Sequence, residues 1–102
     1  MSYLKLTDTT GHQVAESSGA ALRFGRDPDA SVVVRGEEAR VASVRHAELR
    51  FENGAWVLTD LSSKNGTFLN GRRVSTPTVV KQGDVIRLGE SGPEYSVAII
   101  AT

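Results

Sequence analysis

The chain has 102 residues, a length that suits one domain with a single hydrophobic core. Hydrophobic residues make up 39% of it and charged residues 24%, which is ordinary for a globular protein, and the 12 basic and 12 acidic residues cancel. A strong basic excess is the usual mark of nucleic-acid binding, so we expect no nucleic-acid partner.

Residue types and segments that the sequence lacks exclude further kinds of site and of cellular location. No cysteine is present, which excludes disulfides, thiolate nucleophiles and zinc held by cysteine. The two histidines, His12 and His46, lack the spacing of a metal-ligand pair, so we expect neither a metal nor a cofactor. No apolar run reaches the ~18–20 residues of a membrane span, and the N-terminal residues lack a signal-peptide core. These features predict a cytoplasmic location without insertion into a membrane.

The first half of the chain has the pattern of β-strands separated by turns. Short runs alternate between apolar and polar residues, as Leu4 and Leu6 do with Lys5. Such runs predict strands around 4–6, 22–24, 47–52 and 55–60. Between the last two, Asn53-Gly54 supplies the positive φ angles of a tight hairpin.

The second half continues the same pattern. Strands are predicted at 67–69, 72–74, 85–88 and 95–100, with Asn70-Gly71 as a second hairpin turn. Residues 97–100 are all apolar, so we expect this strand to be buried on both faces. The best helical stretch, 36–42, is short and lacks an apolar stripe. The whole chain, 1–102, is therefore predicted to be a single all-β domain, an antiparallel sandwich or barrel, and it can be a piece excised from a longer protein.

The polar residues that suggest a function lie in three predicted loops. Arg26 directly follows the strand-ending Gly25, Ser43 and His46 precede the strand at 47–52, and a polar run occupies 62–67. Loops carried by a rigid sheet are a common place for binding groups. We therefore expect the three segments to act together.

These segments resemble the forkhead-associated (FHA) domain. That family's pattern is Gly-Arg, then Ser-x-x-His, then Asn-Gly-Thr and a second Asn-Gly. All four pieces occur here in order, as Gly25-Arg26, Ser43-x-x-His46, Asn65-Gly66-Thr67 and Asn70-Gly71. Residues 29–34 and 83–89 are also similar to the family, so the resemblance covers essentially the whole chain. It implies an eleven-stranded antiparallel β-sandwich of the FHA/SMAD type that binds phosphothreonine proteins or peptides with the loops at one end.

The resemblance also implies a role for each motif residue. Arg26 would contact the phosphate, Ser43 would donate its hydroxyl to a phosphate oxygen, and Asn65 would hydrogen-bond the peptide main chain. His46 would tie neighbouring loops together, while Gly25 and Gly66 would set backbone geometry. The chemistry agrees, because phosphothreonine carries about −1.5 to −2 charges at pH 7 and an arginine fork matches two of its oxygens.

Two positions depart from the family's usual pattern. The residue after Ser43 is often arginine or asparagine in the family, but here it is Val44, whose side chain donates no hydrogen bond. The resemblance implies an apolar niche for the threonine γ-methyl, and we expect Val44 or the stem of Arg45 to help line it. The residue before Asn65 is often small and hydroxylic, and here it is Lys64. Lys64 and Arg45 are each candidates for a further phosphate contact or for plain solvated charge.

Two other functions compete with phosphopeptide binding. The first is catalysis, since a serine and a histidine together are the elements of a nucleophile and its base. No motif supplies the acid of a triad, and Ser43 is not on a Gly-x-Ser-x-Gly elbow, so we expect no enzyme. The second is a scaffold or self-association domain of the same fold that ignores phosphate. Asn70 is predicted to form only a turn, and nothing in the sequence identifies the partner.

Overall fold

The computed structural model describes residues 2–101. Eleven strands and one short 3-10 helix make up its regular structure. The strands are β1 (Ser2–Asp8), β2 (Gln13–Ser17), β3 (Leu22–Gly25), β4 (Val32–Val33), β5 (Ala47–Glu52), β6 (Ala55–Asp60), β7 (Thr67–Leu69), β8 (Arg72–Arg73), β9 (Thr78–Val79), β10 (Val85–Leu88) and β11 (Glu94–Ala101). The 3-10 helix, η1, spans Gly36–Arg40 and lies within 36–42, the stretch with the most helical sequence.

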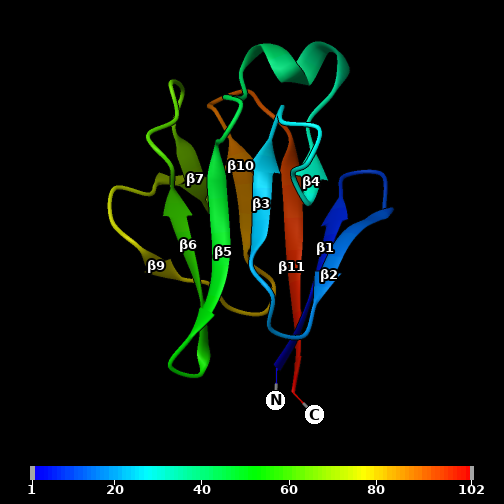
Figure 1. The fold of residues 1–102 in the computed structure, drawn as a ribbon, viewed down its shortest axis with the longest axis vertical. Coiled ribbons are helices and arrows are strands. Elements are labelled where there is room, and N and C mark those ends of the chain that lie inside the picture. The colour runs from blue at the N-terminus through cyan, green and yellow to red at the C-terminus, as the bar shows by residue number, and fades with distance from the viewer. Residues whose placement is uncertain (1, 102) are drawn as a thin grey trace.

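The strands form two sheets that face each other (Figure 1). One sheet has six strands in the order β2-β1-β11-β10-β7-β8, and the other has five in the order β4-β3-β5-β6-β9. The predicted eleven-stranded sandwich is thereby confirmed. The prediction of antiparallel pairing is wrong at one place, because β3 and β4 run parallel. A short loop can make this connection since only Phe24 and Gly25 pair with Val32 and Val33.

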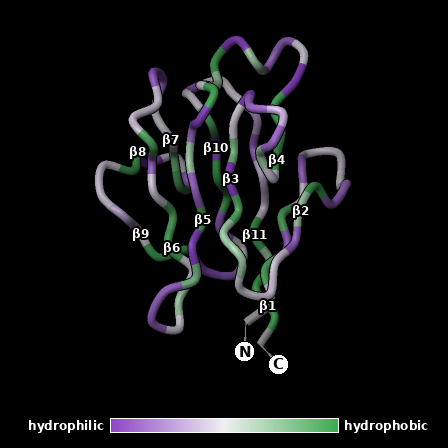
Figure 2. The backbone as a smooth tube through the Cα atoms, viewed as in Figure 1, coloured by the Kyte–Doolittle hydropathy of each residue, from purple (hydrophilic) through white to green (hydrophobic). Residues whose placement is uncertain are grey.

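The core lies between the sheets and follows the alternation along the strands. Leu4 and Leu6 are fully buried, and so are Leu49 and Leu58 on the facing sheet. Trp56 and Phe24 are the largest of the fully buried side chains, and burial of a large apolar side chain contributes about 1.5–3 kcal/mol. Hydrophilic residues gather in the connecting loops, as the purple segments of Figure 2 show.

The last strand corrects one prediction. Val97 is buried, Ala98 and Ile99 are partly buried, and Ile100 is 45% exposed, so residues 97–100 are not buried on both faces. Strand β11 is hydrogen-bonded on both edges, by β1 and β10, but only one face of its sheet packs against the other sheet. Its apolar residues therefore alternate between core and surface.

Both predicted hairpin turns are present. Asn53 and Gly54 have φ angles of 50° and 81°, and Asn70 and Gly71 have 52° and 84°, as tight two-residue turns require. Asn70 does more than turn the chain. Its side chain donates to Asp84 at 3.0 Å and accepts from the Val85 amide at 2.9 Å, which ties the turn to the start of β10.

The two ends of the sandwich carry different parts of the chain. Ser2 pairs with Ala101, so the ends of the described chain lie side by side, and η1 stands at the opposite end of the molecule (Figure 1). Within residues 2–101, no helix is long and apolar enough to cross a membrane.

Candidate functional site

Three loops meet at the η1 end of the sandwich, and backbone contacts fix their positions. The first follows β3, the second runs from η1 to β5, and the third connects β6 to β7. The Arg26 amide donates to the Ser43 carbonyl at 3.1 Å, which joins the first loop to the second. The Leu61 amide donates to the His46 carbonyl at 2.9 Å, which joins the second to the third.

Among the described residues, the guanidinium of Arg26 is held through one of its three nitrogens. Its Nε donates to the Ala42 carbonyl at 2.7 Å, and this contact fixes the plane of the guanidinium. Among the described residues, no carboxylate forms an ion pair with Arg26. The two terminal nitrogens therefore remain available as a fork for an external anion.

Ser43 and the backbone at Lys64 are linked directly. The Lys64 amide donates to the Ser43 Oγ at 3.0 Å. A serine hydroxyl can accept and donate at the same time, so this bond leaves the Ser43 proton free for an external acceptor. The same bond brings the third loop to the second, because the two residues are 21 positions apart in sequence.

His46 is fully buried and holds two loops through both ring nitrogens. The Ser43 amide donates to Nδ1 at 3.1 Å, and Nε2 lies 2.7 Å from the Gly66 carbonyl. A carbonyl only accepts, so Nε2 carries the proton and the ring is neutral. Burial lowers the pKa of His46, although the Gly66 carbonyl and the Asp60 charge oppose the shift.

Asn65 is exposed and bridges to the loop after η1. Its Nδ2 donates to the Val41 carbonyl at 2.9 Å, which leaves the side-chain oxygen free to accept. Asp60, at the end of β6, orders the loop that presents Asn65. Asp60 accepts from the Thr67 hydroxyl at 2.7 Å and from both the hydroxyl and the amide of Ser63.

Gly25 and Gly66 are the two glycines of the motif. Position 25 requires glycine because the backbone of the 41–46 loop passes close to its Cα. A Cβ built on Gly25 would lie 2.1 Å from the Val44 carbonyl oxygen. At Gly66 the requirement is conformational, since its φ angle is +85°. Both glycines thus let the three loops come together.

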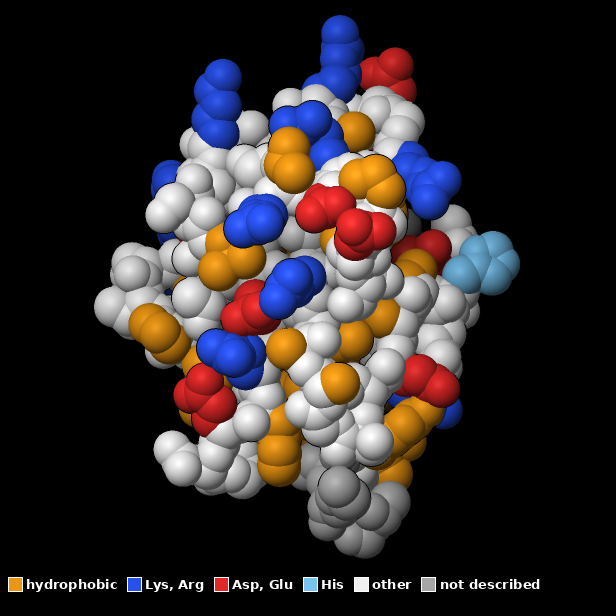
Figure 3. Space-filling model, in the orientation of Figure 1, with side chains coloured by type: hydrophobic (Ala, Val, Ile, Leu, Met, Phe, Trp, Pro, Cys, Tyr) orange, Lys and Arg blue, Asp and Glu red, His pale blue; other side chains and the backbone are white. Residues whose placement is uncertain are grey.

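The arrangement surrounds an open groove of about 490 Å³. Its lining includes three cations, Arg26, Arg40 and Lys64, and no carboxylate. Ser43 and Asn65 complete the polar lining, and Figure 3 shows Lys and Arg side chains projecting from this end of the molecule. Such a groove is suited to an anion carried on an extended segment, with Arg26 and Ser43 as donors.

The structure does not bring every predicted site residue into the groove. Arg26, Ser43, Lys64 and Asn65 line it together. Val44 and Arg45 are instead exposed and line a smaller neighbouring depression with Phe24 and Leu61 as its apolar floor.

Ser43 and His46 are not arranged as a nucleophile and its base. The serine contacts the imidazole through its backbone amide, and both ring nitrogens are occupied by backbone groups. A base must reach the hydroxyl whose proton it abstracts, and here the hydroxyl bonds to Lys64 instead.

Fold and groove together define a class, an all-β sandwich that binds through the loops at one end. The FHA domain model matches residues 22–89, and the chain belongs to the FHA domain family. Domains of this family are binding modules and are generally not enzymes.

Individual relatives agree with the family. FhaB of Mycobacterium tuberculosis is 34% identical over 94 residues, which covers 90% of this chain and 58% of FhaB. A structure from work on phosphothreonine-dependent FHA domain interactions is 31% identical, with a TM-score of 0.78 over 99% of this chain and 98% of that one. Mycobacterium tuberculosis EmbR, solved with a low-affinity phosphopeptide, is 27% identical with a TM-score of 0.83, over 98% of this chain and 25% of EmbR. The chain spans less than two thirds of the length of FhaB and of EmbR.

Two groups at the site were not predicted from sequence. Arg40 lines the groove from η1. In the sequence it stands in a short segment of mixed charge with Glu37 and Glu38, which gave no reason to predict that it takes part in binding. Asp60 orders the loop of Asn65, and its signal was an acidic residue placed just before a Ser-rich turn, where carboxylates commonly cap backbone amides.

Proposed function

We propose that this domain binds segments of other proteins that carry phosphothreonine. The observation that carries the proposal is the groove with three cations, no carboxylate and a free arginine fork. A phosphothreonine brings about −1.5 to −2 charges and three acceptor oxygens at pH 7, which match these donors. The similarity to EmbR, solved with a phosphopeptide, and to a structure from work on phosphothreonine-dependent FHA domain interactions supports the same interpretation.

Each groove residue has a defined part in the proposal. Arg26 binds two phosphate oxygens with its terminal nitrogens, and Ser43 donates its hydroxyl to a third. Lys64 adds charge from the rim. Asn65 accepts from a peptide amide with its free side-chain oxygen. Val44 and Arg45 lie beside the groove and contact residues that flank the phosphothreonine.

The remaining parts of the proposal concern the whole chain. Residues 1–102 form one domain, which the pairing of β1 with β11 along their length supports. The domain catalyses no reaction, because Ser43 and His46 hold loops together and are not placed as a nucleophile and its base. It acts in the cytoplasm as a signalling module, and its specific partner is set by the rest of the peptide.

A phosphothreonine peptide-library screen tests the proposal. Each peptide is immobilised beside its unphosphorylated twin and probed with the wild-type domain and with Arg26→Ala. We expect retention on phosphorylated peptides only, and loss of that retention in the variant. Retention that ignores phosphate and survives Arg26→Ala would replace the proposal with a phosphate-independent scaffold.

A further inference from the structure

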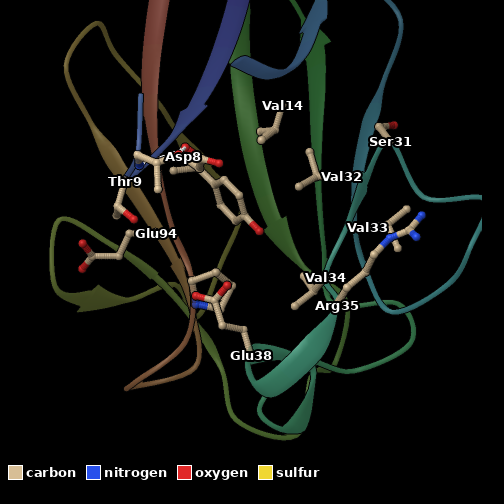
Figure 4. Close-up of a pocket in the computed structure, with 13 residues that line it drawn as sticks. Asp8, Thr9, Val14, Ser31, Val32, Val33, Val34, Arg35, Glu38 and Glu94 are labelled. Carbon is tan, nitrogen blue, oxygen red and sulfur yellow. Dashed lines mark hydrogen bonds between the residues drawn. The ribbon is translucent and has the colours of Figure 1, made fainter. Parts of the chain in front are cut away.

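A second open cavity, of about 470 Å³, lies between the two sheets (Figure 4). The β1–β2 turn and the start of β11 contribute one side of it, and β4 with the residues that follow contributes the other. None of the residues that line it belongs to the groove of Arg26. The cavity is therefore separate from the proposed phosphothreonine site.

One wall of the cavity is apolar. Val32 and Val34 lie across the cavity from Glu94 in Figure 4, and Val14 of β2 adds to the apolar lining. Val32 and Val34 are almost fully buried and belong to the hydrophobic core, which holds this wall in place. A wall of this kind packs well against the methylene stem of a long side chain.

Much of the remaining lining is acidic. Asp8, Glu38 and Glu94 contribute carboxylates, and Arg35 is the one cation in the lining. Glu94 is 3.7 Å from Arg87, and Asp8 uses one oxygen for the β1–β2 turn. Among residues 2–101, the Glu38 carboxylate has no hydrogen-bond or ion-pair partner.

A buried tyrosine completes the cavity. Tyr95 is only 5% exposed and packs on Phe24 with ring centroids 5.6 Å apart. It lines the cavity, and its hydroxyl has no hydrogen-bond partner among the described residues. Burial raises the pKa of Tyr95 to about 12, and the charges of Glu38 and Asp8 add to the shift. A neutral hydroxyl with unused acceptor capacity therefore lines the same cavity as Glu38 and Asp8.

We propose that this cavity binds the side chain of a lysine or arginine of the same partner whose phosphothreonine occupies the groove. The apolar wall takes the stem, and Glu38, Asp8 and the Tyr95 hydroxyl accept hydrogen bonds from the cationic tip. The proposal rests on the proposed function only for the identity of the partner.

The position of the cavity favours that partner. Neighbouring residues of one short segment line the two hollows, with Val34, Arg35 and Glu38 in the cavity and Gly36 and Arg40 in the groove. One extended chain can therefore reach both by crossing η1. A metal ion is a poor occupant, because no group of three or more His, Asp or Glu side chains in the described part of the chain could hold one.

A peptide scan tests the proposal. Lysine is placed at each position of a bound phosphothreonine peptide and compared with norleucine, which keeps most of the stem and lacks the charge. At one position we expect lysine to bind about two- to fivefold more tightly, as for a favourable partly exposed ion pair. Glu38→Gln should remove this preference and leave the norleucine peptide unaffected.

Glu37→Gln is the matched control. Glu37 lies beside Glu38 in η1, but it pairs with Arg40 at 3.5 Å and does not line the cavity. We expect this variant to keep the lysine preference. No lysine preference at any position, or one that survives Glu38→Gln, would overturn the proposal.

A second experiment does not depend on phosphate. Nα-acetyl-lysine methylamide is titrated into the wild-type domain, and backbone amide shifts are followed by NMR. We expect shifts concentrated at Val34, Glu38 and Tyr95, absent with the norleucine analogue and lost in Glu38→Gln. Shifts elsewhere, or none, would overturn the cavity assignment. If the domain fails to bind phosphopeptides but passes this test, the proposed function fails and the basic side-chain site stands.

Discussion

At the scale of single residues, Arg26 should dominate affinity. Arg26→Ala removes the guanidinium that Ala42 holds in the groove, and we expect a loss of about 2–5 kcal/mol, typical when one partner of a charged hydrogen-bonded pair is truncated. Ser43→Ala should cost about 1.5–3 kcal/mol, as for a hydrogen bond to a charged group. Isothermal titration calorimetry with one phosphothreonine peptide measures both losses.

Arg50→Ala is the control for this pair. Arg50 is an exposed arginine of β5 that contacts Glu48 and lies outside the groove, so affinity should not change. Circular dichroism should show all three variants folded. If Ser43→Ala weakens binding and Arg26→Ala does not, the phosphate site is assigned to the wrong residues.

Phosphothreonine should bind more tightly than phosphoserine. Burial of the extra methyl group is worth about 0.8 kcal/mol, roughly fourfold in affinity, and the branched side chain has less χ1 freedom to lose. In the groove Ala39 and Ala42 are the apolar groups that can receive this methyl. Val44 lies outside the groove, so Val44→Ala should leave the ratio unchanged. Equal affinities of matched peptides would show that no methyl contact is made.

His46 should make stability depend on pH below about 6.5. Because its pKa is lowered in the folded state, the unfolded chain takes up a proton first, and the free energy of unfolding falls as pH drops from the unfolded pKa, about 6.5, to the folded one. Uptake of one proton lowers the free energy of unfolding by at most about 1.4 kcal/mol per pH unit. Above pH 6.5 the residue contributes no slope.

Urea unfolding at a series of pH values measures this slope. His46→Gln should be less stable throughout and should lack the His46 part of the slope. The lowered pKa values of Asp8 and Glu16 act only at lower pH, since their ordinary values are 3.8 and 4.5. A slope between pH 6.5 and 5 that is the same in both proteins would contradict the neutral buried imidazole.

At the scale of elements, the end of β3 is the most sensitive point. Gly25→Ala would place a Cβ 2.1 Å from the Val44 carbonyl oxygen, so β3 or the 41–46 loop must move. We expect a cost of about 1–3 kcal/mol, as for overpacking, and weaker phosphopeptide binding. Gly19→Ala is the control, because a Cβ there has no neighbour within 4 Å. Thermal unfolding of both variants tests this, and equal melting temperatures would show that the loops tolerate the shift.

The elements that the sequence predicted are those whose signal is local. Alternation located the strands around 47–52 and 55–60, and Asn53-Gly54 located their hairpin, because each signal lies within a few residues. Strands β4 and β9 have only two residues each, too few for a period to appear. The exposure of Ile100 depends on which face of the sheet is covered, and no local pattern carries that information.

Only the site residues that belong to the family motif could be predicted from the sequence. Gly25, Arg26, Ser43 and Asn65 were found because they follow the pattern of a family. The cavity of Tyr95 was not found, since its residues come from separate segments and have no motif spacing. Contacts of this kind follow from how the two sheets pack, which the sequence does not display locally.

At the scale of the whole molecule, the binding loops lie at one end of the sandwich and the ends of the described chain, Ser2 and Ala101, at the other (Figure 1). Net charge is zero, so the positive groove is a local feature and not the result of a basic protein. Long-range steering by the whole molecule should therefore be weak, and affinity should depend on contacts made in the groove.

The central claim is that phosphate decides binding, and a calorimetric titration of one peptide with and without its phosphate tests it most directly. We expect the phosphothreonine peptide to bind with a micromolar Kd, roughly −8 kcal/mol, and its unphosphorylated twin to give no heat of binding. Affinity should fall as pH drops through about 6, where the second phosphate proton returns. Equal binding of the two peptides would contradict the account.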